Sequence, residues 1–395
     1  MISSAAVTGG RATEDDAIPG RSESPGGATT SRVNDLSRVA RLPLTYDECR
    51  ARFVHASVEA EADRIGHSLA ARGPDGQSLS VDTVRLGPID APTCLVVLSG
   101  VHGVEGFVGS ALQCELLGRW TELPRHVSVV VVHAVNPWGM AWWRRQNESN
   151  VDLNRNWRRD EGIPFDNAAY EELHPLACPD TDELPPVEAM LAAAQGLVAE
   201  RGLVWVRDGI TVGQYRHPDG LHFGGDRTEE SNRILEGVVS RLVVGADRVL
   251  TVDLHTGHGP AGTVTALSDQ PPGSPQDQLL AAWCDRVEAT ADNPDATTGT
   301  KAGQIANGFA DLLPGVECFA TSLEFGTVDD LTQLAATYQE QWVHRHGDRD
   351  DPRHAAAVWA YRCCFTPDDP DWETAALAGG RAHLDRALQT VATWS

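Results

Sequence analysis

The chain has 395 residues and a formal net charge of −24, and it is long enough to form one large domain with a sizeable core. The acidic balance excludes an electrostatic nucleic-acid-binding protein, because such a protein needs a basic surface that neutralises phosphates. The acidic residues are spread along the chain. We therefore interpret the charge as a solvated surface that identifies no partner.

The cysteine pattern and the hydropathy pattern bear on the cellular compartment. Eight cysteines are scattered along the chain without a CxxC pair, which is typical of neither a disulfide framework nor a thiolate zinc site and favours a reducing compartment. The first residues contain no apolar run of signal-peptide length, and no later stretch has the uninterrupted apolar length of a membrane span. We expect a cytoplasmic protein without a membrane partner.

The beginning of the chain differs in composition from the rest. Residues 1–42 are rich in Gly, Ser, Thr, Pro and charge and show no periodicity, so we predict a disordered tail. A single catalytic domain is expected over residues 43–395. It begins with a predicted helix over 47–71 and a short strand over 79–85.

Four further apolar runs predict buried strands, over residues 94–98, 127–134, 248–254 and 319–325. The stretches between and after them predict helices near 105–119, 187–201, 227–242, 275–291, 329–345 and 371–392. This alternation predicts the α/β class, with a mixed, largely parallel central sheet that helices cover on both faces. The segment 158–225 is rich in Pro, Gly, Asp and His and predicts long loops with one helix, an elaboration around a site.

A candidate zinc site comes from three residues at predicted strand ends. His102 and Glu105 form an HxxE motif in the glycine-rich turn after the strand 94–98, and His255 ends the strand 248–254. Catalytic zinc sites usually use three protein ligands and leave a position for water, and two histidines with a glutamate are a known set. HxxE alone is weak, because such a pair often occurs by chance. The coincidence of several strand ends makes one Zn²⁺ the favoured interpretation.

Glu324 supplies a carboxylate at the end of the predicted strand 319–325. An unpaired glutamate in an apolar strand is costly, and a carboxylate beside a metal-activated water is the group that a hydrolase needs as its general base. The alternative is that Glu324 pairs with a buried arginine.

The segment 136–157 carries the remaining candidate site residues. Asn154 and Arg155 can bind a substrate carboxylate, because a guanidinium group offers a two-pronged donor face. Either Arg144 or Arg145 could stabilise the oxyanion that forms at a carbonyl under attack. Asp152 would suit a supporting role, accepting the free N–H of a metal-bound imidazole.

These motifs together resemble the M14 zinc carboxypeptidase superfamily, which includes the aspartoacylase and succinylglutamate desuccinylase branch, and most closely its DUF2817 group. The resemblance covers most of residues 90–330. It implies a zinc-carboxypeptidase-like fold. It also implies a role for each residue that matches one of the superfamily's motifs. It implies zinc ligands at His102, Glu105 and His255, a general base at Glu324, an oxyanion contact at Arg144, and a carboxylate-binding pair at Asn154 and Arg155.

The chain also departs from the superfamily pattern. Digestive carboxypeptidases carry an arginine inside the first motif, where this chain has Val104, and the HGVE form looks like that of the deacylase branch. The tyrosine that many family peptidases use near the substrate has only weak candidates, Tyr215 and Tyr338. His217 and His222 could bind a second metal, but surface-loop histidines are the commoner case.

The function expected from these residues is hydrolysis of an amide bond in a substrate that carries a carboxylate. A carboxypeptidase-like metallopeptidase acting on a peptide is the first hypothesis, because Asn154 and Arg155 need a carboxylate near the scissile bond. An N-acyl amino acid or small-amide deacylase is the second, favoured by the HGVE form and by Val104. A non-catalytic binding protein on the same scaffold is the third.

Overall fold

The computed structural model describes residues 42–162, 166–291 and 301–394. The predicted tail over residues 1–42 falls outside this part except at Leu42, so the proposed division into a tail and one catalytic domain stays a prediction. Among the described residues, no helix has both the length and the apolar composition needed to cross a membrane.

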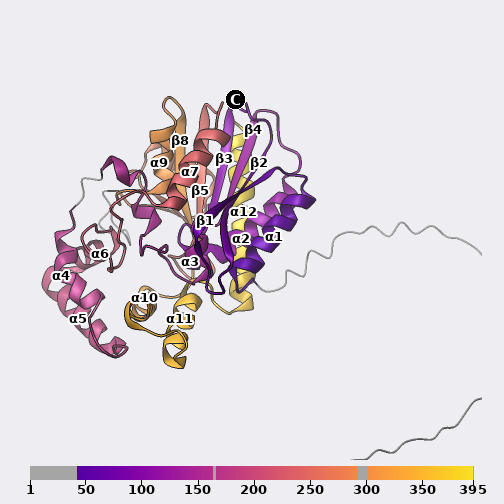
Figure 1. Cartoon of the computed structure of the whole chain (residues 1–395). Helices are drawn as coiled ribbons and strands as arrows, with labels where there is room; N and C mark the ends of the chain where they lie inside the picture. Colours follow the sequence, from indigo (N-terminus) through magenta and orange to yellow (C-terminus); the bar gives the residue numbers. More distant parts are fainter. Residues whose placement is uncertain (1–41, 163–165, 292–300, 395) are drawn as a thin grey trace, which may run out of the picture. The chain divides into compact units, whose positions relative to one another are not determined.

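An eight-stranded mixed sheet forms the centre of the fold (Figure 1), in the order β1-β2-β4-β3-β5-β8-β6-β7. Its strands are β1 (Arg64–Arg72), β2 (Ser78–Leu86), β3 (Thr93–Ser99), β4 (Val127–His133), β5 (Arg248–Gly257), β6 (Val264–Ser268), β7 (Val287–Ala289) and β8 (Glu317–Gly326). The four central strands β4, β3, β5 and β8 are parallel, whereas β2 and β6 join them antiparallel. The predicted α/β class and mixed, largely parallel sheet are confirmed.

Helices cover both faces of the sheet because its buried strands present apolar side chains in both directions. Leu95 and Val97 of β3 face a core with α1 (Tyr46–Glu59), α2 (Gly106–Arg119), α8 (Pro275–Trp283) and α12 (Pro370–Ala392). The alternate residues Val96 and Leu98 face a second core with α7 (Glu230–Leu242) and α9 (Ile305–Leu312). The two-residue period of a strand thus divides one apolar run between two cores.

A further group of helices lies away from these two layers, below the sheet in the view of Figure 1. It comprises α4 (Ala168–Ala177), α5 (Val187–Arg201), α6 (Leu203–Thr211), α10 (Asp330–His346) and α11 (Pro352–Phe365). Helix α10 packs against both α11 and α5, and α4 packs against α6. The short helix α3 (Pro137–Ala141) and the 3₁₀ turns η1 (Gly103–Glu105), η2 (Leu153–Arg155) and η3 (Arg159–Glu161) complete the described elements.

Three predicted elements differ from the structure. The helix expected over 47–71 ends at Glu59, and its second half is the edge strand β1, which buries only Leu69 and therefore shows no clear alternation. The helix expected over 275–291 ends at Trp283 and is followed by β7. The segment 158–225 holds three helices rather than one, because α4 accommodates Pro175 and only Gly202 separates α5 from α6.

Candidate metal centre

The candidate ligands lie at the carboxyl ends of neighbouring parallel strands. Strands β3, β5 and β8 are adjacent in the sheet, and His102 follows β3 while His255 and Glu324 lie near the ends of β5 and β8. His255 and Glu324 are direct partners in the register of the two strands. This edge of an open α/β sheet is where ligands usually bind.

Three side chains converge on one point, and all three are buried. Nδ1 of His255 lies 2.8 Å from Oε2 of Glu105 and 3.1 Å from Nδ1 of His102, and Nδ1 of His102 lies 3.0 Å from Oε1 of Glu105. The donor atoms of a tetrahedral zinc ion lie about 3.3 Å from one another, given metal–ligand distances of about 2.0–2.1 Å. The spacing and the donor types therefore fit one zinc ion, and these three residues form a group that could hold it.

Two buried aspartates orient the imidazoles. Nε2 of His102 is hydrogen-bonded to Oδ1 of Asp152 at 3.2 Å, and Nε2 of His255 lies 2.7 Å from Oδ2 of Asp253. A carboxylate beside Nε2 favours a proton on that nitrogen and leaves the lone pair of Nδ1 for a metal. The sequence predicts this role for Asp152 but not for Asp253. The sequence signal for Asp253 is the motif DLH at residues 253–255, because residues two apart on a strand share a face.

The turn that carries His102 and Glu105 is fixed by the neighbouring segment. Val104 N–H donates to the carbonyl of Arg144 at 2.8 Å, and Gly103 N–H donates to the carbonyl of Arg145 at 3.3 Å. A side chain at Gly103 would not fit, because its Cβ would lie 2.0 Å from the carbonyl carbon of Gly139. The glycine after His102 thus permits the close contact that positions Glu105.

The members of the cluster strongly shift one another's pKa values. Burial raises the pKa of Glu105, but His102 and then His255 outweigh it and hold the pKa below its usual range. Burial lowers the pKa of His255, whereas Asp253 and Glu105 raise it well above its usual value. Opposite charges close to one another in a dry site account for both directions.

The two adjacent arginines have different surroundings. The Arg144 side chain is fully buried and forms an ion pair with Glu340, with Nε 3.0 Å from Oε1; its Nη2 donates to Gln341 at 2.9 Å. Arg145 instead lines the cavity above the cluster, with Nη1 3.0 Å from Oε1 of Glu105. The structure therefore does not bring Arg144 to the site, and of the two alternatives weighed for the oxyanion contact it favours Arg145.

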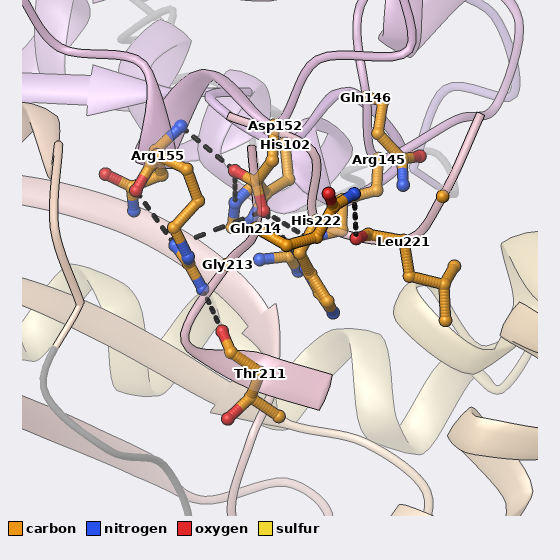
Figure 2. Close-up of polar contacts among 12 residues, drawn as sticks. His102, Arg145, Gln146, Asp152, Arg155, Thr211, Gly213, Gln214, Leu221 and His222 are labelled. Atoms are coloured by element: carbon orange, nitrogen blue, oxygen red, sulfur yellow. Dashed lines mark hydrogen bonds and ion pairs between the residues drawn. The ribbon is translucent and has the colours of Figure 1, made fainter. Parts of the chain in front are cut away.

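Asp152 is the centre of a polar network. Figure 2 shows charged groups on several sides of its carboxylate. Besides His102, its carboxylate accepts from Nε of Arg145 at 3.2 Å and contacts Nδ1 of His222 at 3.1 Å, and Nη1 of Arg155 lies 4.0 Å away. Burial raises the pKa of Asp152, but Arg145 and Arg155 hold it well below its usual value. Burial lowers the pKa of His222 to about 4, so this imidazole is neutral near pH 7.

Asn154 and Arg155 line the same cavity. Nη1 and Nη2 of Arg155 donate to the carbonyls of Asn154 and Thr211 at 2.8 and 2.6 Å, as Figure 2 shows for the second bond. Oδ1 of Asn154 accepts from the N–H of Ile305 at 2.9 Å. These bonds fix both side chains, and Tyr215 donates its hydroxyl to the Arg155 carbonyl at 2.7 Å.

One cavity of about 520 Å³ opens onto the cluster, and its wall includes Glu324 as well as the three candidate ligands. Lys301, the only lysine of the chain, also lines it. Burial, followed by the charge of Arg155, lowers the pKa of Lys301 to about 8. The sequence alone gives Lys301 no role, because biased codon usage accounts for a single lysine without any chemistry.

The remaining tyrosine and histidine candidates are distributed differently. Tyr361, rather than Tyr215 or Tyr338, lies in the cavity wall. His222 also reaches the cavity, whereas His217 belongs to a second, partly exposed group with His174 and Asp219 that could hold a metal ion. Nε2 of His217 is 3.0 Å from Glu171, and its ring stacks on His174 with centroids 3.9 Å apart.

The fold and the site together define an α/β protein. At the carboxyl ends of its parallel strands it carries a cluster of two histidines and one glutamate, of the kind that binds metal ions. The model of the DUF2817 family, described as a protein of unknown function, matches residues 43–379. The chain belongs to this family, as the sequence resemblance implied. No curated protein matches the chain.

Several solved structures are similar to this chain. A metallo-carboxypeptidase from Burkholderia cenocepacia is 14% identical with a TM-score of 0.44, over 88% of this chain and 69% of that one. Carboxypeptidase A from Helicoverpa armigera is 11% identical with a TM-score of 0.43, over 87% and 78%. An aspartoacylase family protein from Mesorhizobium loti is 14% identical with a TM-score of 0.35, over 71% and 66%. At these values they assign no activity to this chain.

Proposed function

We propose that the protein is a metal-dependent hydrolase that cleaves an amide bond close to a substrate carboxylate, with one Zn²⁺ bound by His102, Glu105 and His255. The observation that carries this proposal is the convergence of three buried side chains in the wall of a cavity, with 2.8–3.1 Å between the nearest donor atoms of each pair. Glu324 stands on the neighbouring strand in register with His255.

Zinc, when bound at such a site, supplies Lewis-acid polarisation of the carbonyl and eases deprotonation of water. The protein's side chains transfer the proton and position the substrate. Glu324 takes a proton from the attacking water and passes it to the leaving amine. The C–N bond breaks, a C–O bond to the water oxygen forms, and the products are a carboxylate and an amine.

Other residues position the substrate and the ligands. Asn154 and Arg155 bind the carboxylate of the leaving part, and Arg145 stabilises negative charge on the carbonyl oxygen. Asp152 and Asp253 hold the two imidazoles in one orientation. Arg145 takes the role that the sequence resemblance implied for Arg144, because Arg144 is engaged with Glu340.

Two substrate classes fit this chemistry. A peptide cleaved at its carboxyl-terminal residue is the first, and an N-acyl amino acid is the second. The second is favoured by the surroundings of Val104, which is fully buried and packs in a cluster with Tyr361 and Phe365. Position 104 therefore offers no contact to an extended peptide. A non-catalytic binding protein remains the third hypothesis.

Metal analysis of the purified full chain and of the Glu324→Gln variant tests the proposal. We expect about one zinc per chain in both proteins, turnover of an amide substrate in the first, and loss of at least about a hundredfold in kcat in the second. Chelation should abolish turnover and added zinc should restore it. Glu317→Gln is the matched control, because Glu317 is exposed at the far end of the same strand.

Each alternative gives a different result. Metal-free protein with no amide turnover would favour the binding protein. Loss of zinc from Glu324→Gln would show that this residue is a ligand rather than the base. Turnover that survives chelation would refute the metal-dependent mechanism.

A further inference from the structure

The cavity has an apolar wall that the proposed chemistry does not use. Three helices contribute it, with Leu191, Ala194 and Val198 from α5, Leu203, Val206 and Ile210 from α6, and Leu331 and Leu334 from α10. Residues spaced by three, four or seven share one face of a helix. Each helix thus turns an apolar stripe toward the same space, with polar side chains beside it, among them Gln195, Arg207 and Gln333.

Part of this wall is open to solvent. Leu203 is 66% exposed and Leu331 is 56% exposed, although both border a cavity whose floor is charged. Contiguous apolar surface of this kind marks a binding site in soluble proteins. The cavity therefore has two chemically distinct ends, and a ligand that fills it must be amphipathic.

The space on the carboxylate side is small and polar. Beyond Asn154 the structure forms a side pocket of about 10 Å³, lined among others by Asp269, Lys301 and Ser322. Such a volume holds little more than one water molecule. With the carboxylate at Asn154 and Arg155 and the amide carbonyl at the cluster, the side pocket beyond Asn154 has no room for a large apolar group.

The apolar wall also offers few partners for a peptide backbone. It is built from helices, whose interior N–H and C=O groups are hydrogen-bonded within each helix. An extended peptide along these stripes would find partners for its amide groups only at the polar side chains beside them, such as Gln195 and Arg207, and leaving the other amide groups without partners is costly. A hydrocarbon chain has no such requirement.

From these observations we infer that the substrate is an N-acyl amino acid whose aliphatic acyl chain lies between α5, α6 and α10. The acyl chain that fills this space is longer than an acetyl group. The amino acid part of the substrate carries the carboxylate that Asn154 and Arg155 bind. This inference rests on the proposed function, because the orientation of the chain follows from the amide at His102, Glu105 and His255. The products are a fatty acid and a free amino acid.

A series of N-acyl amino acids with acetyl, butanoyl, hexanoyl and octanoyl chains tests this inference on the zinc-loaded full chain. All four compounds carry the same amino acid, chosen as the one that the protein releases fastest from a panel of N-hexanoyl amino acids. Each methylene removed from water contributes up to about fourfold to affinity. We expect kcat/KM to rise at least about thirtyfold from acetyl to octanoyl. N-acetyl dipeptides with the same terminal amino acid should be poorer substrates than the octanoyl compound.

Two valines of α6 supply a matched pair of variants. Val206 lines the cavity, whereas Val204 is 43% exposed and does not. Val206→Asp should lower kcat/KM for the octanoyl substrate about tenfold or more, because it places a charge against the chain. The decrease should be smaller for the acetyl substrate, and a urea-unfolding transition close to that of the unaltered chain shows that the variant folds. Val204→Asp should leave both values within about twofold.

Binding separates this inference from the proposed function. Calorimetry with the Glu324→Gln variant should show tighter binding of octanoyl than of acetyl amino acids, independent of turnover. Binding that depends on chain length without any hydrolysis by the unaltered chain would refute the hydrolase proposal alone. Hydrolysis with a kcat/KM that is indifferent to chain length, or better hydrolysis of the dipeptides, would overturn the acyl-chain inference while leaving the hydrolase intact.

Discussion

The carboxylate of Asp253 lies 2.7 Å from Nε2 of His255, two residues further along β5. Both side chains are buried and share one face of the strand. Because Asp253 occupies the Nε2 side of the ring, Nδ1 is the nitrogen that faces Glu105, 2.8 Å away. One strand thus supplies both a candidate ligand and the group that orients it.

Asp253→Asn should lower zinc affinity about 10–100-fold, because the amide no longer stabilises the orientation of His255 with a full negative charge. Competition with a chromophoric chelator measures the affinity. Asp269→Asn is the control, since Asp269 lines the side pocket and bonds Thr290 and Asn307 instead. Equal affinities in the two variants would contradict an orienting role for Asp253.

Arg144 and Arg145 should respond differently to the same substitution. Arg144→Gln removes the buried partner of Glu340, 3.0 Å away, and should lower the free energy of unfolding by about 3 kcal/mol. Arg145→Gln should instead lower kcat/KM at least about a hundredfold, because Arg145 is the arginine above the cluster. Urea denaturation and steady-state kinetics on both variants measure these effects. A catalytic loss confined to Arg144→Gln in folded protein would reverse the assignment.

The sequence predicts where the candidate ligands stand but not every neighbour. His102, His255 and Glu324 could be placed together because each follows an apolar run, and parallel strands bring their carboxyl ends to one edge. The resemblance implies Arg144, and the residues alone leave the choice between Arg144 and Arg145 open, because the outcome depends on the tight turn before them, where Trp143 has a φ of +54°. Non-glycine residues seldom adopt this conformation, and no local pattern indicates it.

Residues that reach the cavity from distant loops were also beyond prediction. His222 and Lys301 carry no motif, and only tertiary packing brings them to Asp152 and Arg155. At the fold level, the sequence predicts helix at the edge strand β1, because an edge strand with one buried residue has little periodicity to detect. Strands with two buried faces, such as β3 and β4, were predicted within two residues of their ends.

Lys301 should titrate near pH 8, because burial in the cavity wall lowers the pKa of its ammonium group to about 8. As the chain has no other lysine, reductive ¹³C-methylation labels only Lys301 and the amino terminus, and NMR can follow the Lys301 signal directly. Raising the pH through 8 removes its charge and should weaken binding of an anionic substrate beside Arg155. Lys301→Arg should retain that binding to higher pH. A titration near 10.5 would show instead that the ammonium is fully hydrated.

His133 should make the folded protein sensitive to mild acid. Its ring is fully buried, stacks on Phe53 and bonds Ser110 through Nε2 at 2.9 Å, and burial lowers its pKa to about 4. In the unfolded chain a histidine has a pKa of about 6.5, so between about pH 6.5 and pH 4 the unfolded state binds more protons.

The contribution of His133 to stability is therefore present above about pH 6.5 and is lost as the pH falls, by up to about 3 kcal/mol near pH 4. Urea unfolding at pH 7.5 and pH 5 should show a smaller decrease in unfolding free energy for His133→Phe than for the unaltered chain, since phenylalanine cannot take up a proton. His126→Phe serves as the control, because His126 is only partly buried. An identical decrease in all three proteins would assign the acid sensitivity to other groups.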